Sequence, residues 1–491
     1  MTMMRLNMGD NKKFLLAPLF CLFLVGCVDT SRSFMQNAQQ PLQYDNAKYM
    51  SSPEENLYTN DKETIKSNYG LADLIDVAQN NNPETRIAWE LAKKAATNIG
   101  MVESTYLPVI TATALSGYQK GKINLPRNEL VDKVEVSNRF FVPALTFQWL
   151  LFDFGQRDAL AKAAKHASLA SDLNFNIMHQ KVIHDVSVAY YSYGAAQKKN
   201  KITQESLVRS QDVLYAVEQK RVRGLATVLD VALAKQQVAQ MELQVVLAKN
   251  HEKDQYQFLL SAIGMSPFQT INIEYTDEGA LPDDSAPLTH DMIKQALSQR
   301  PDVLANYELA QAAVDTSRSV ESTYFPRVYL AGAVAGGSNS LGVQNLPDIN
   351  QSTSSTNIFI GVSIPLYEGG IRQARMKNAQ SDIFIAQENL RKSQDVAIRE
   401  ITVTENALKS ALEANKAAKN LIDTTELTYT ASVEFYRNGL GTVTEMNAAE
   451  IVLLNAKIAY IDSHTASLVA AVDLAFALGD IEKALPNIEA Y

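Results

Sequence analysis

The stretch VESTYLP, at residues 102–108, recurs as VESTYFP at residues 320–326, which is 218 positions later in the chain. The likeness is not confined to this phrase. Three further pairs of segments match at an offset of 215, namely LLFDFGQRDA with PLYEGGIRQA, RGLATVLDV with NGLGTVTEM, and LLSAIG with LAFALG. One unit of roughly 190 residues therefore occurs twice, which indicates a duplicated module because solenoid repeats are only about 20 to 50 residues long.

The duplication divides the chain into segments with distinct expected roles. We expect the first structural repeat at residues 71–264 and the second at 288–479, joined by a linker at 265–287. Each repeat has the same order: a short helix, a helix that begins at a proline, two strands, a very long helix, a tight turn and a further helix. Residues 27–70 are expected to form an N-terminal lipidated linker, and residues 480–491 a C-terminal tail.

Residues 156–222 and 371–437 are predicted to form two very long helices, because the first contains no proline and one glycine and the second contains neither. At 1.5 Å per residue, about 67 residues extend roughly 100 Å, which exceeds the diameter of a compact domain. Apolar residues after the first turn step by three and four, as in coiled coils: Val231, Ala234, Val238, Met241, Val245 and Ala248. The long helices are therefore predicted to belong to helical hairpins at about 156–264 and 371–479.

The segments that precede the long helices have the alternating pattern of strands. Strands are expected at about 106–118 and 139–152 in the first repeat and at about 324–336 and 356–367 in the second. In the last of these, Ile358, Ile360 and Val362 alternate with Phe359 and Gly361. One apolar face and one small or polar face suit a sheet with lipid on one side and water on the other. A half-buried soluble sheet has the same alternation and is the alternative at this point.

The number of strands has a consequence for assembly. Four strands are too few to close a barrel, for which about eight are the minimum. An open sheet edge in lipid would leave unpaired backbone groups, each of which costs several kcal/mol. If the strands enter a membrane, several chains must therefore share one barrel, and the protein is expected to be an obligate oligomer.

Residues 1–26 are predicted to be a lipoprotein signal peptide. Arg5, Lys12 and Lys13 precede the apolar run FLLAPLFCLFLV, which is too short to span a bilayer. The run ends in LVGC, which resembles the bacterial lipobox, so Cys27 is the expected site of lipidation. The alternative is a plain signal peptide with a chance cysteine, and incorporation of labelled palmitate that disappears in Cys27→Ser is the measurement that distinguishes the two.

Composition and motifs exclude several classes of function. The net charge of −9 and the isoelectric point near 5.4 argue against a nucleic-acid partner. The sequence contains no Walker loop and no G-x-S-x-G nucleophile elbow, and its six histidines are scattered. Cys21 would leave with the signal peptide, so the mature chain has no free thiol for a metal site. We therefore predict no enzymatic activity, no cofactor and no metal site.

The duplicated strand–strand–helix plan resembles that of the TolC-like outer-membrane efflux proteins. The resemblance covers roughly residues 70–480 and rests on the strand endings LLFDFGQR and PLYEGGIR and on the helix turns RVRGLATVLDV and YRNGLGTVTEM. It implies an α+β membrane protein that forms a trimer, with a 12-strand β-barrel continued by a periplasmic α-helical tunnel. It also implies a lipid-anchored position in the outer membrane, a periplasmic adaptor and an inner-membrane ABC or RND-type transporter.

The resemblance assigns roles to the two turns between the long helices. Adaptor docking is expected at Arg223, Gly224, Leu225, Gly439, Leu440, Gly441 and Thr442, where glycines allow the chain to reverse. Asp230 and Glu445, just inside the turns, align with acidic residues that constrict the tunnel in this family, so we expect them to form a periplasmic gate. A further acidic position of the family is Ala448 here. The alternatives are ordinary turn packing and capping of the helix starts, where acidic residues suit the helix dipole.

Three functional hypotheses follow from the sequence. The first is an export duct for small toxic molecules, in a tripartite system with an adaptor and an inner-membrane transporter. The second is the exit duct of a type I protein-secretion system, for example one that exports adhesins. The third is a structural, periplasm-spanning coiled-coil lipoprotein without a pore. The pattern of the strands argues against the third, and the sequence leaves the choice between the first two open.

Overall fold

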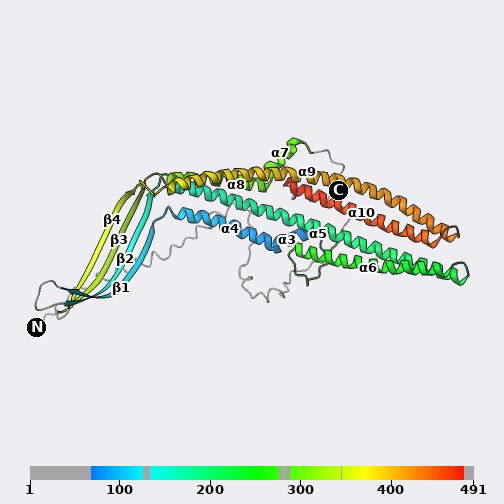
Figure 1. Ribbon diagram of the computed structural model, residues 1–491, viewed down its shortest axis with the longest axis horizontal. Helices are drawn as coiled ribbons and strands as arrows, with labels where there is room; N and C mark the ends of the chain where they lie inside the picture. The colour runs from blue at the N-terminus through cyan, green and yellow to red at the C-terminus, as the bar shows by residue number, and fades with distance from the viewer. Residues whose placement is uncertain are drawn as a thin grey trace, which may run out of the picture.

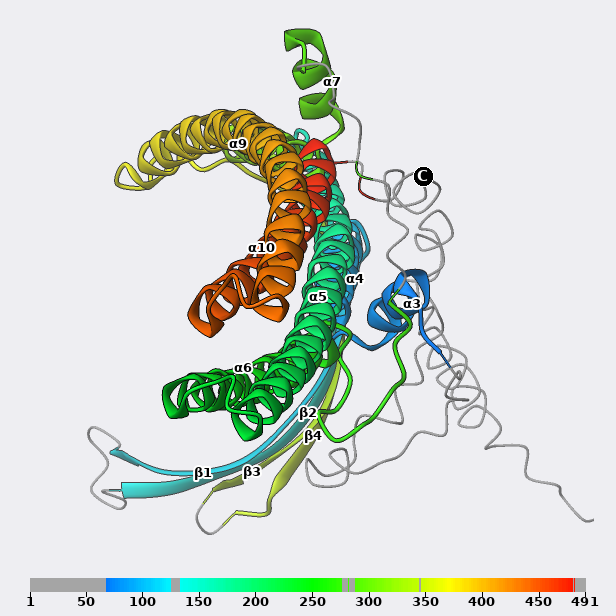
Figure 2. The ribbon, with the colours of Figure 1, turned by 90° about the vertical axis from the view of Figure 1, so that its right-hand side faces the viewer.

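The computed structural model describes residues 68–124, 133–275, 281, 288–343, 346–479 and 481, and Figure 1 shows their arrangement. The predicted signal peptide, Cys27, most of the N-terminal linker and nearly all of the C-terminal tail lie outside the described residues. Within them, a four-stranded sheet stands at one end of a long helical body (Figure 1). Viewed along the long axis, the sheet and the long helices follow curved paths (Figure 2).

Each half of the chain contributes four helices in the same order. The first half has α3 (Leu71–Asn81), α4 (Pro83–Ser104), α5 (Gln156–Val222) and α6 (Val228–Ala262). The second half has α7 (His290–Gln299), α8 (Pro301–Ser322), α9 (Ile371–Arg437) and α10 (Val443–Leu478). The expected prolines stand at the start of α4 and α8, where a missing N–H costs nothing. The sequence-based bounds of the two long helices, α5 and α9, coincide with those observed.

The helices pack as two hairpins joined by shorter elements. α5 pairs with α6 and α9 pairs with α10, while α8 packs against both α5 and α9 and so connects the halves. The turns of both hairpins lie at the end of the molecule opposite the sheet (Figure 1). Because α4 and α8 end where the strands begin, the strand connections lie together at the junction between sheet and helices.

The sheet has the order β1-β2-β3-β4, with every neighbouring pair antiparallel. Its strands are β1 (Val109–Asn124), β2 (Lys133–Phe152), β3 (Arg327–Val343) and β4 (Ile349–Ser363). At the end of the sheet away from the helices, all four strands extend about six or seven residues beyond the expected ranges. The reason is that the ladder of backbone hydrogen bonds continues through polar residues such as those between Gln351 and Asn357, whose side chains give no apolar signal.

The register places a continuous group of apolar residues from all four strands on one surface, here called the apolar face. Side chains alternate along a strand, so every second residue of β2, including Leu145, Phe147 and Trp149, lies on this face. Their cross-strand partners on the neighbouring strands lie on the same face. On β3 and β4 they are Leu330, Val334, Ile358, Ile360 and Val362. The opposite face, here called the polar face, carries Thr146 and Gln148 together with small residues and a few large apolar ones, among them Leu115 and Phe359.

The repeated ending of the second strand builds the junction with the long helix. In LLFDFGQR, the side chain of Arg157 is buried, donates from Nε to Asp153 at 2.8 Å and donates to the Thr105 carbonyl at 3.0 Å. In PLYEGGIR, Arg372 contacts Glu368 at 3.0 Å and donates to the Pro365 carbonyl at 2.8 Å. The arginine of each repeat therefore ties the end of a strand to the first turn of a long helix.

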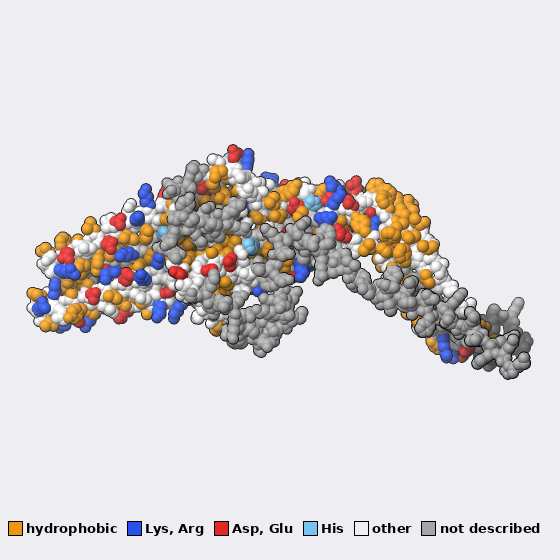
Figure 3. Space-filling model, turned by 180° about the vertical axis from the view of Figure 1, so that it is seen from behind, with side chains coloured by type: hydrophobic (Ala, Val, Ile, Leu, Met, Phe, Trp, Pro, Cys, Tyr) orange, Lys and Arg blue, Asp and Glu red, His pale blue; other side chains and the backbone are white. Residues whose placement is uncertain are grey.

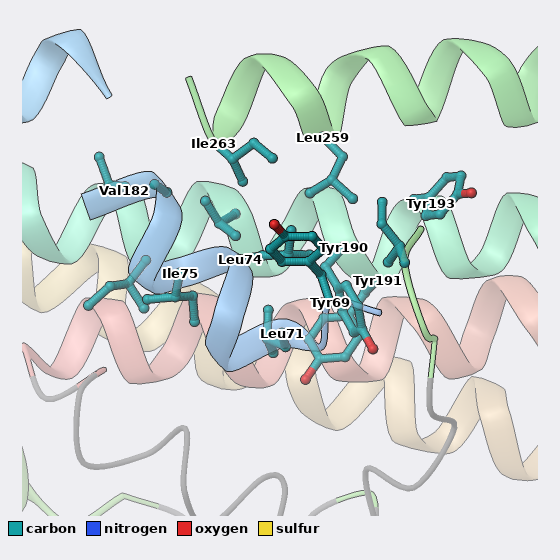
Figure 4. Packing of buried hydrophobic residues seen from close by; sticks show 14 of the residues in the cluster. Tyr69, Leu71, Leu74, Ile75, Val182, Tyr190, Tyr191, Tyr193, Leu259 and Ile263 are labelled. Atoms are coloured by element: carbon teal, nitrogen blue, oxygen red, sulfur yellow. The ribbon is translucent and has the colours of Figure 1, made fainter. Parts of the chain in front are cut away.

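The largest buried apolar cluster lies midway along the helices, where α3 covers α5 and α6 (Figure 4). It contains Leu74 of α3, Leu259 and Ile263 near the end of α6, and Tyr190 and Tyr191 of α5. Both tyrosines are almost fully buried, so they act as packing residues. Gly194 lies directly beneath the Tyr275 ring, so a side chain there would collide with it. This cluster, which also includes Ile271 and Ile273 of the linker, holds α3 against the first hairpin.

Candidate functional site

The first candidate feature is the turn between α5 and α6. α5 ends at Val222, and Gly224 follows with φ of +76°, a left-handed conformation that favours glycine. The Leu225 N–H then donates to the Lys220 carbonyl at 2.8 Å, which satisfies one of the last carbonyls of the helix. Thr227 begins α6 as its N-cap. The chain reverses in four residues as a result.

The turn between α9 and α10 repeats this geometry. α9 ends at Arg437, Gly439 has φ of +77°, and the Leu440 N–H donates to the Phe435 carbonyl at 2.8 Å. Gly441 differs from the expectation, because its φ is not positive. Its reason is close packing instead: a Cβ there would lie 3.2 Å from that of Phe435. Thr442 then caps α10.

The turns expose apolar side chains at the far end of the molecule. The side chains of Leu225 and Leu440 are 72 % and 79 % exposed, respectively. Val222, Val228 and Leu229 add further exposed apolar surface on the first turn. Among the residues that the sequence assigned to docking, the two leucines are therefore available to a partner, whereas the glycines shape the backbone.

Behind the turns, the two hairpins are held together by an apolar cluster and by one cation. Val217, Val231 and Ala234 of the first hairpin pack with Val443 of the second. Lys220 of α5 donates from Nζ to the Tyr436 carbonyl of α9 at 2.8 Å. The same ammonium lies 4.0 Å from the centre of the Tyr436 ring, which is a cation–π contact. Sequence reasoning missed Lys220 and Tyr436, since neither the turn motif nor the heptad pattern indicates which residues of two separate hairpins meet.

The predicted gate residues occupy the same position at the start of their helices. The Thr227 N–H donates to the Asp230 carboxylate at 2.8 Å, and the Thr442 N–H donates to the Glu445 carboxylate at 2.9 Å. In return, the hydroxyl oxygens of Thr227 and Thr442 accept hydrogen bonds from the backbone N–H groups of Asp230 and Glu445, so each turn ends in a capping box. The bonds from the Thr227 backbone and hydroxyl lower the pKa of Asp230. Burial first, and then the charge of Asp230, raise the pKa of Tyr436.

A buried carboxylate connects the hairpins farther from the turns. Glu450 of α10 is 4 % exposed and accepts hydrogen bonds from the Ser206 hydroxyl at 2.5 Å and from Arg209 Nε at 3.0 Å, both on α5. Tyr429 of α9 lies beside it. Burial, followed by the negative charge of Glu450, raises the pKa of Tyr429 to about 12. Sequence reasoning did not single out Glu450, because it reads as one of many helix carboxylates.

His184 of the first long helix contacts two carboxylates. His184 contacts Asp185 through Nδ1 at 2.9 Å and Asp473 of α10 through Nε2 at 2.7 Å. These bonds and charges outweigh burial, which acts in the opposite direction, and raise the pKa of His184 to about 9. The imidazolium therefore links α5 to α10 at neutral pH. Within the described part of the chain, no group of three or more His, Cys, Asp or Glu side chains is arranged to hold a metal ion.

The sequence and the fold both match known proteins. The sequence profile of the "Outer membrane efflux protein" family matches residues 74–265 and 292–480. The outer membrane protein OprJ of Pseudomonas aeruginosa is 24 % identical over 411 residues, covering 83 % of this chain and 84 % of OprJ. The probable outer membrane lipoprotein SilC of Salmonella typhimurium is 22 % identical, covering 93 % and 96 % of the two chains.

A solved structure extends the comparison to three dimensions. The Campylobacter jejuni CmeC outer membrane channel superposes with a TM-score of 0.68 at 18 % sequence identity. The match covers 85 % of this chain and 89 % of the CmeC chain. At this identity the likeness concerns the fold alone, and that fold includes both the sheet and the paired helical hairpins.

Proposed function

The chain belongs to the outer membrane efflux protein family, and from this premise we propose that it is the outer-membrane exit duct of a tripartite export system. The observation that carries the proposal is the apolar face of the sheet. The strands of this sheet lead directly into long helices, and the exposed turns of these helices lie at the opposite end of the molecule (Figure 1). A sheet that contacts lipid and helices long enough to reach roughly 100 Å fit a duct that crosses the outer membrane and the periplasm.

The proposed duct is a trimer. β1 and β4 are both edge strands, so the backbone groups on their outer sides need partners if the sheet lies in lipid. Three copies of four strands would pair these edges and close a barrel of the size found in outer membranes. α10 also supports association, because the most apolar part of this helix is only about one-third buried within one chain.

The proposal is tested by mass and conductance. The full protein, extracted in mild detergent, is expected to have the mass of three chains and to conduct ions after reconstitution into planar bilayers. A monodisperse monomer with an intact sheet would refute the trimer. A trimer that never conducts under any applied voltage would instead favour the structural lipoprotein without a pore.

Efflux of small molecules or ions is the function we favour over protein secretion. Several relatives carry names that specify such cargo, among them the cation efflux system protein CusC of Escherichia coli and the toluene efflux pump protein TtgF of Pseudomonas putida. By this proposal, deletion of the gene should sensitise cells to small toxic compounds. Loss of a secreted protein from the medium, without such sensitivity, would favour the type I secretion alternative.

The exposed leucines of the turns are the proposed docking points for a periplasmic adaptor. We expect Leu440→Asp to reduce export strongly while the trimer still assembles, because it places a charge in an apolar contact. Asn438→Asp is the matched control, since it adds the same charge to the same turn and keeps the leucine. Export that is equally impaired in both variants would show that charge at the turn, and not loss of the leucine, is responsible.

Asp230 and Glu445 are the proposed periplasmic gate. In a trimer, three copies of each would place six carboxylates at the mouth of the tunnel, where they would attract cations. We expect the double substitution Asp230→Ala/Glu445→Ala to raise single-channel conductance and lower cation selectivity. It should also lower the free energy of unfolding by about 1 kcal/mol for each capping box removed. Glu242→Ala, on the same helix as Asp230 but farther from the turn, is the control. Wild-type conductance and selectivity in the double variant would place the gate elsewhere.

A further inference from the structure

The apolar face of the sheet changes character toward the end that lies away from the helices. The register aligns Tyr118 with Arg139, Arg139 with Ser340, and Ser340 with Asn350, so these four residues form one row across all four strands. They belong to the same face as Leu145 and Trp149, because each lies an even number of residues from an apolar-face residue of its own strand. A polar row therefore follows directly on an apolar band.

The distance along β2 places this row at the boundary of the membrane. Arg139 precedes Trp149 by ten positions, which is about 33 Å along a strand at 3.3 Å per residue. With the strand tilt of about 40° that barrels adopt, this is roughly 25 Å of height, the thickness of their apolar band. Figure 3 shows apolar side chains gathered over the part of the sheet nearest the helices, with charged side chains only near its far end.

Arg139 and the residues just beyond the row carry an excess of positive charge. Lys120 and Lys122 of β1 both contact Glu135 of β2, at 2.8 Å and 3.0 Å, and this one carboxylate serves both. The guanidinium of Arg139 lies 5.6 Å from the centre of the Tyr118 ring and, within the described residues, forms no ion pair. A further carboxylate, Asp348, lies beside Gly342, at the level of Lys120. Together with the residues beyond it, the row thus has three described cations against two described carboxylates.

Aromatic and hydroxyl groups surround the cations. Tyr118 and Phe141 are exposed on this face, at the level where outer-membrane barrels carry their aromatic girdle. Together with Arg139 they border a shallow hollow of about 740 Å³, within the range of small-molecule sites. The rest of its lining on this face is hydroxyl and amide, from Ser116, Ser338, Ser340, Ser352 and Asn350. Such groups bind sugar hydroxyls, and an arginine fork matches phosphate.

We propose that this row is a binding site for the phosphorylated sugar headgroup of an outer-leaflet glycolipid. The acyl chains would lie along the apolar band below, the phosphates would contact Arg139, Lys120 and Lys122, and the sugar would occupy the hydroxyl-lined hollow. The proposal rests on the proposed function to the extent that the sheet must stand in the outer membrane. It goes beyond it by assigning a specific lipid partner to one edge of the barrel.

The test measures glycolipid bound to the full protein purified from outer membranes in mild detergent. Native mass spectrometry of the wild type should show retained phosphorylated glycolipid. The triple substitution Lys120→Gln/Lys122→Gln/Arg139→Gln is expected to reduce the retained amount at least tenfold. Arg327→Gln, a basic residue of the same sheet at the end next to the helices, is the control and should retain the wild-type amount. Equal retention in all three proteins would overturn the proposal.

A second arm needs no variant. Delipidated wild-type protein is supplied with the intact glycolipid or with the same lipid after its phosphates have been removed, and the intact form should bind at least tenfold more tightly. Equal binding of both would overturn the proposal, as would displacement by inorganic phosphate at millimolar concentration, which indicates a simple anion site. Mass and conductance of the same samples report on the trimeric channel separately, so a channel without glycolipid preference refutes only the lipid site.

Discussion

Replacing Ile358 by arginine is expected to prevent the sheet from assembling in the outer membrane, whereas the same replacement at Phe359 is expected to leave assembly intact. The two residues are neighbours on β4 and project from opposite faces. Ile358 is 75 % exposed in the single chain and belongs to the apolar face, while Phe359, 54 % exposed, belongs to the polar face. Their exposure is similar, so the difference in outcome would come from what each face contacts.

The expected size of the effect follows from the cost of a charge in lipid. Arginine on the lipid-facing side of a barrel costs about 2–4 kcal/mol at the middle of the bilayer and about 0–1 kcal/mol near its interfaces. Ile358 lies one row inside the Trp149 row, so we expect an intermediate cost of about 1–2 kcal/mol per chain, or about 3–6 kcal/mol for the three copies of a trimer. Arginine on the polar face meets water and has no comparable cost. The measurement is the yield of folded trimer in outer-membrane fractions. Similar yields for both variants would contradict the assignment of the two faces, and with it the membrane position of the sheet.

The sequence predicted the long helices well, because their signals are local. Proline and glycine are nearly absent from α5 and α9, while Gly155, Gly224, Gly370 and Gly439 stand at their boundaries. Their duplication doubled the evidence for each element. The strand ends were predicted less well, since polar strand residues such as Asn350 and Ser352 look like loop residues until their backbone partners are known.

The contacts between the hairpins could not be predicted in the same way. A heptad pattern indicates which face of a helix is buried, but not how far one helix is shifted along another. Ser206 and Glu450 are separated by 244 positions, and their contact depends on the relative height of α5 and α10. The junction arginines are a different case. Arg157 and Arg372 occupy equivalent places in two copies of one motif. The repeat in the sequence therefore indicated that the two arginines have the same structural role.

Glu450→Ala is expected to destabilise the contact between the hairpins more than any substitution at the turns. Removing one member of a buried ion pair costs about 3–5 kcal/mol because the remaining charge is left unpaired. The Arg209 side chain is 28 % exposed and keeps some access to water, so we expect a value near the lower limit. The measurement is the free energy of unfolding from denaturant titration of the helical circular dichroism signal. Asp462→Ala is the control, since Asp462 pairs with Lys199 between the same two helices but is largely exposed, and such pairs contribute about 0–1 kcal/mol.

The double variant Arg209→Met/Glu450→Leu separates the loss of a charge pair from the loss of packing. If the cost of Glu450→Ala comes from an unpaired Arg209, replacing both charges by apolar groups of similar size should recover most of the stability, as in other buried pairs. The loss of unfolding free energy in the double variant could instead equal the sum of the losses in Arg209→Met and Glu450→Leu. That result would show that Glu450 acts through packing alone. Recovery of stability together with a raised resting conductance would mean that the buried charge is kept for another reason. It would fix the height of α10 against α5, and so the relative position of the two turns where Asp230 and Glu445 stand.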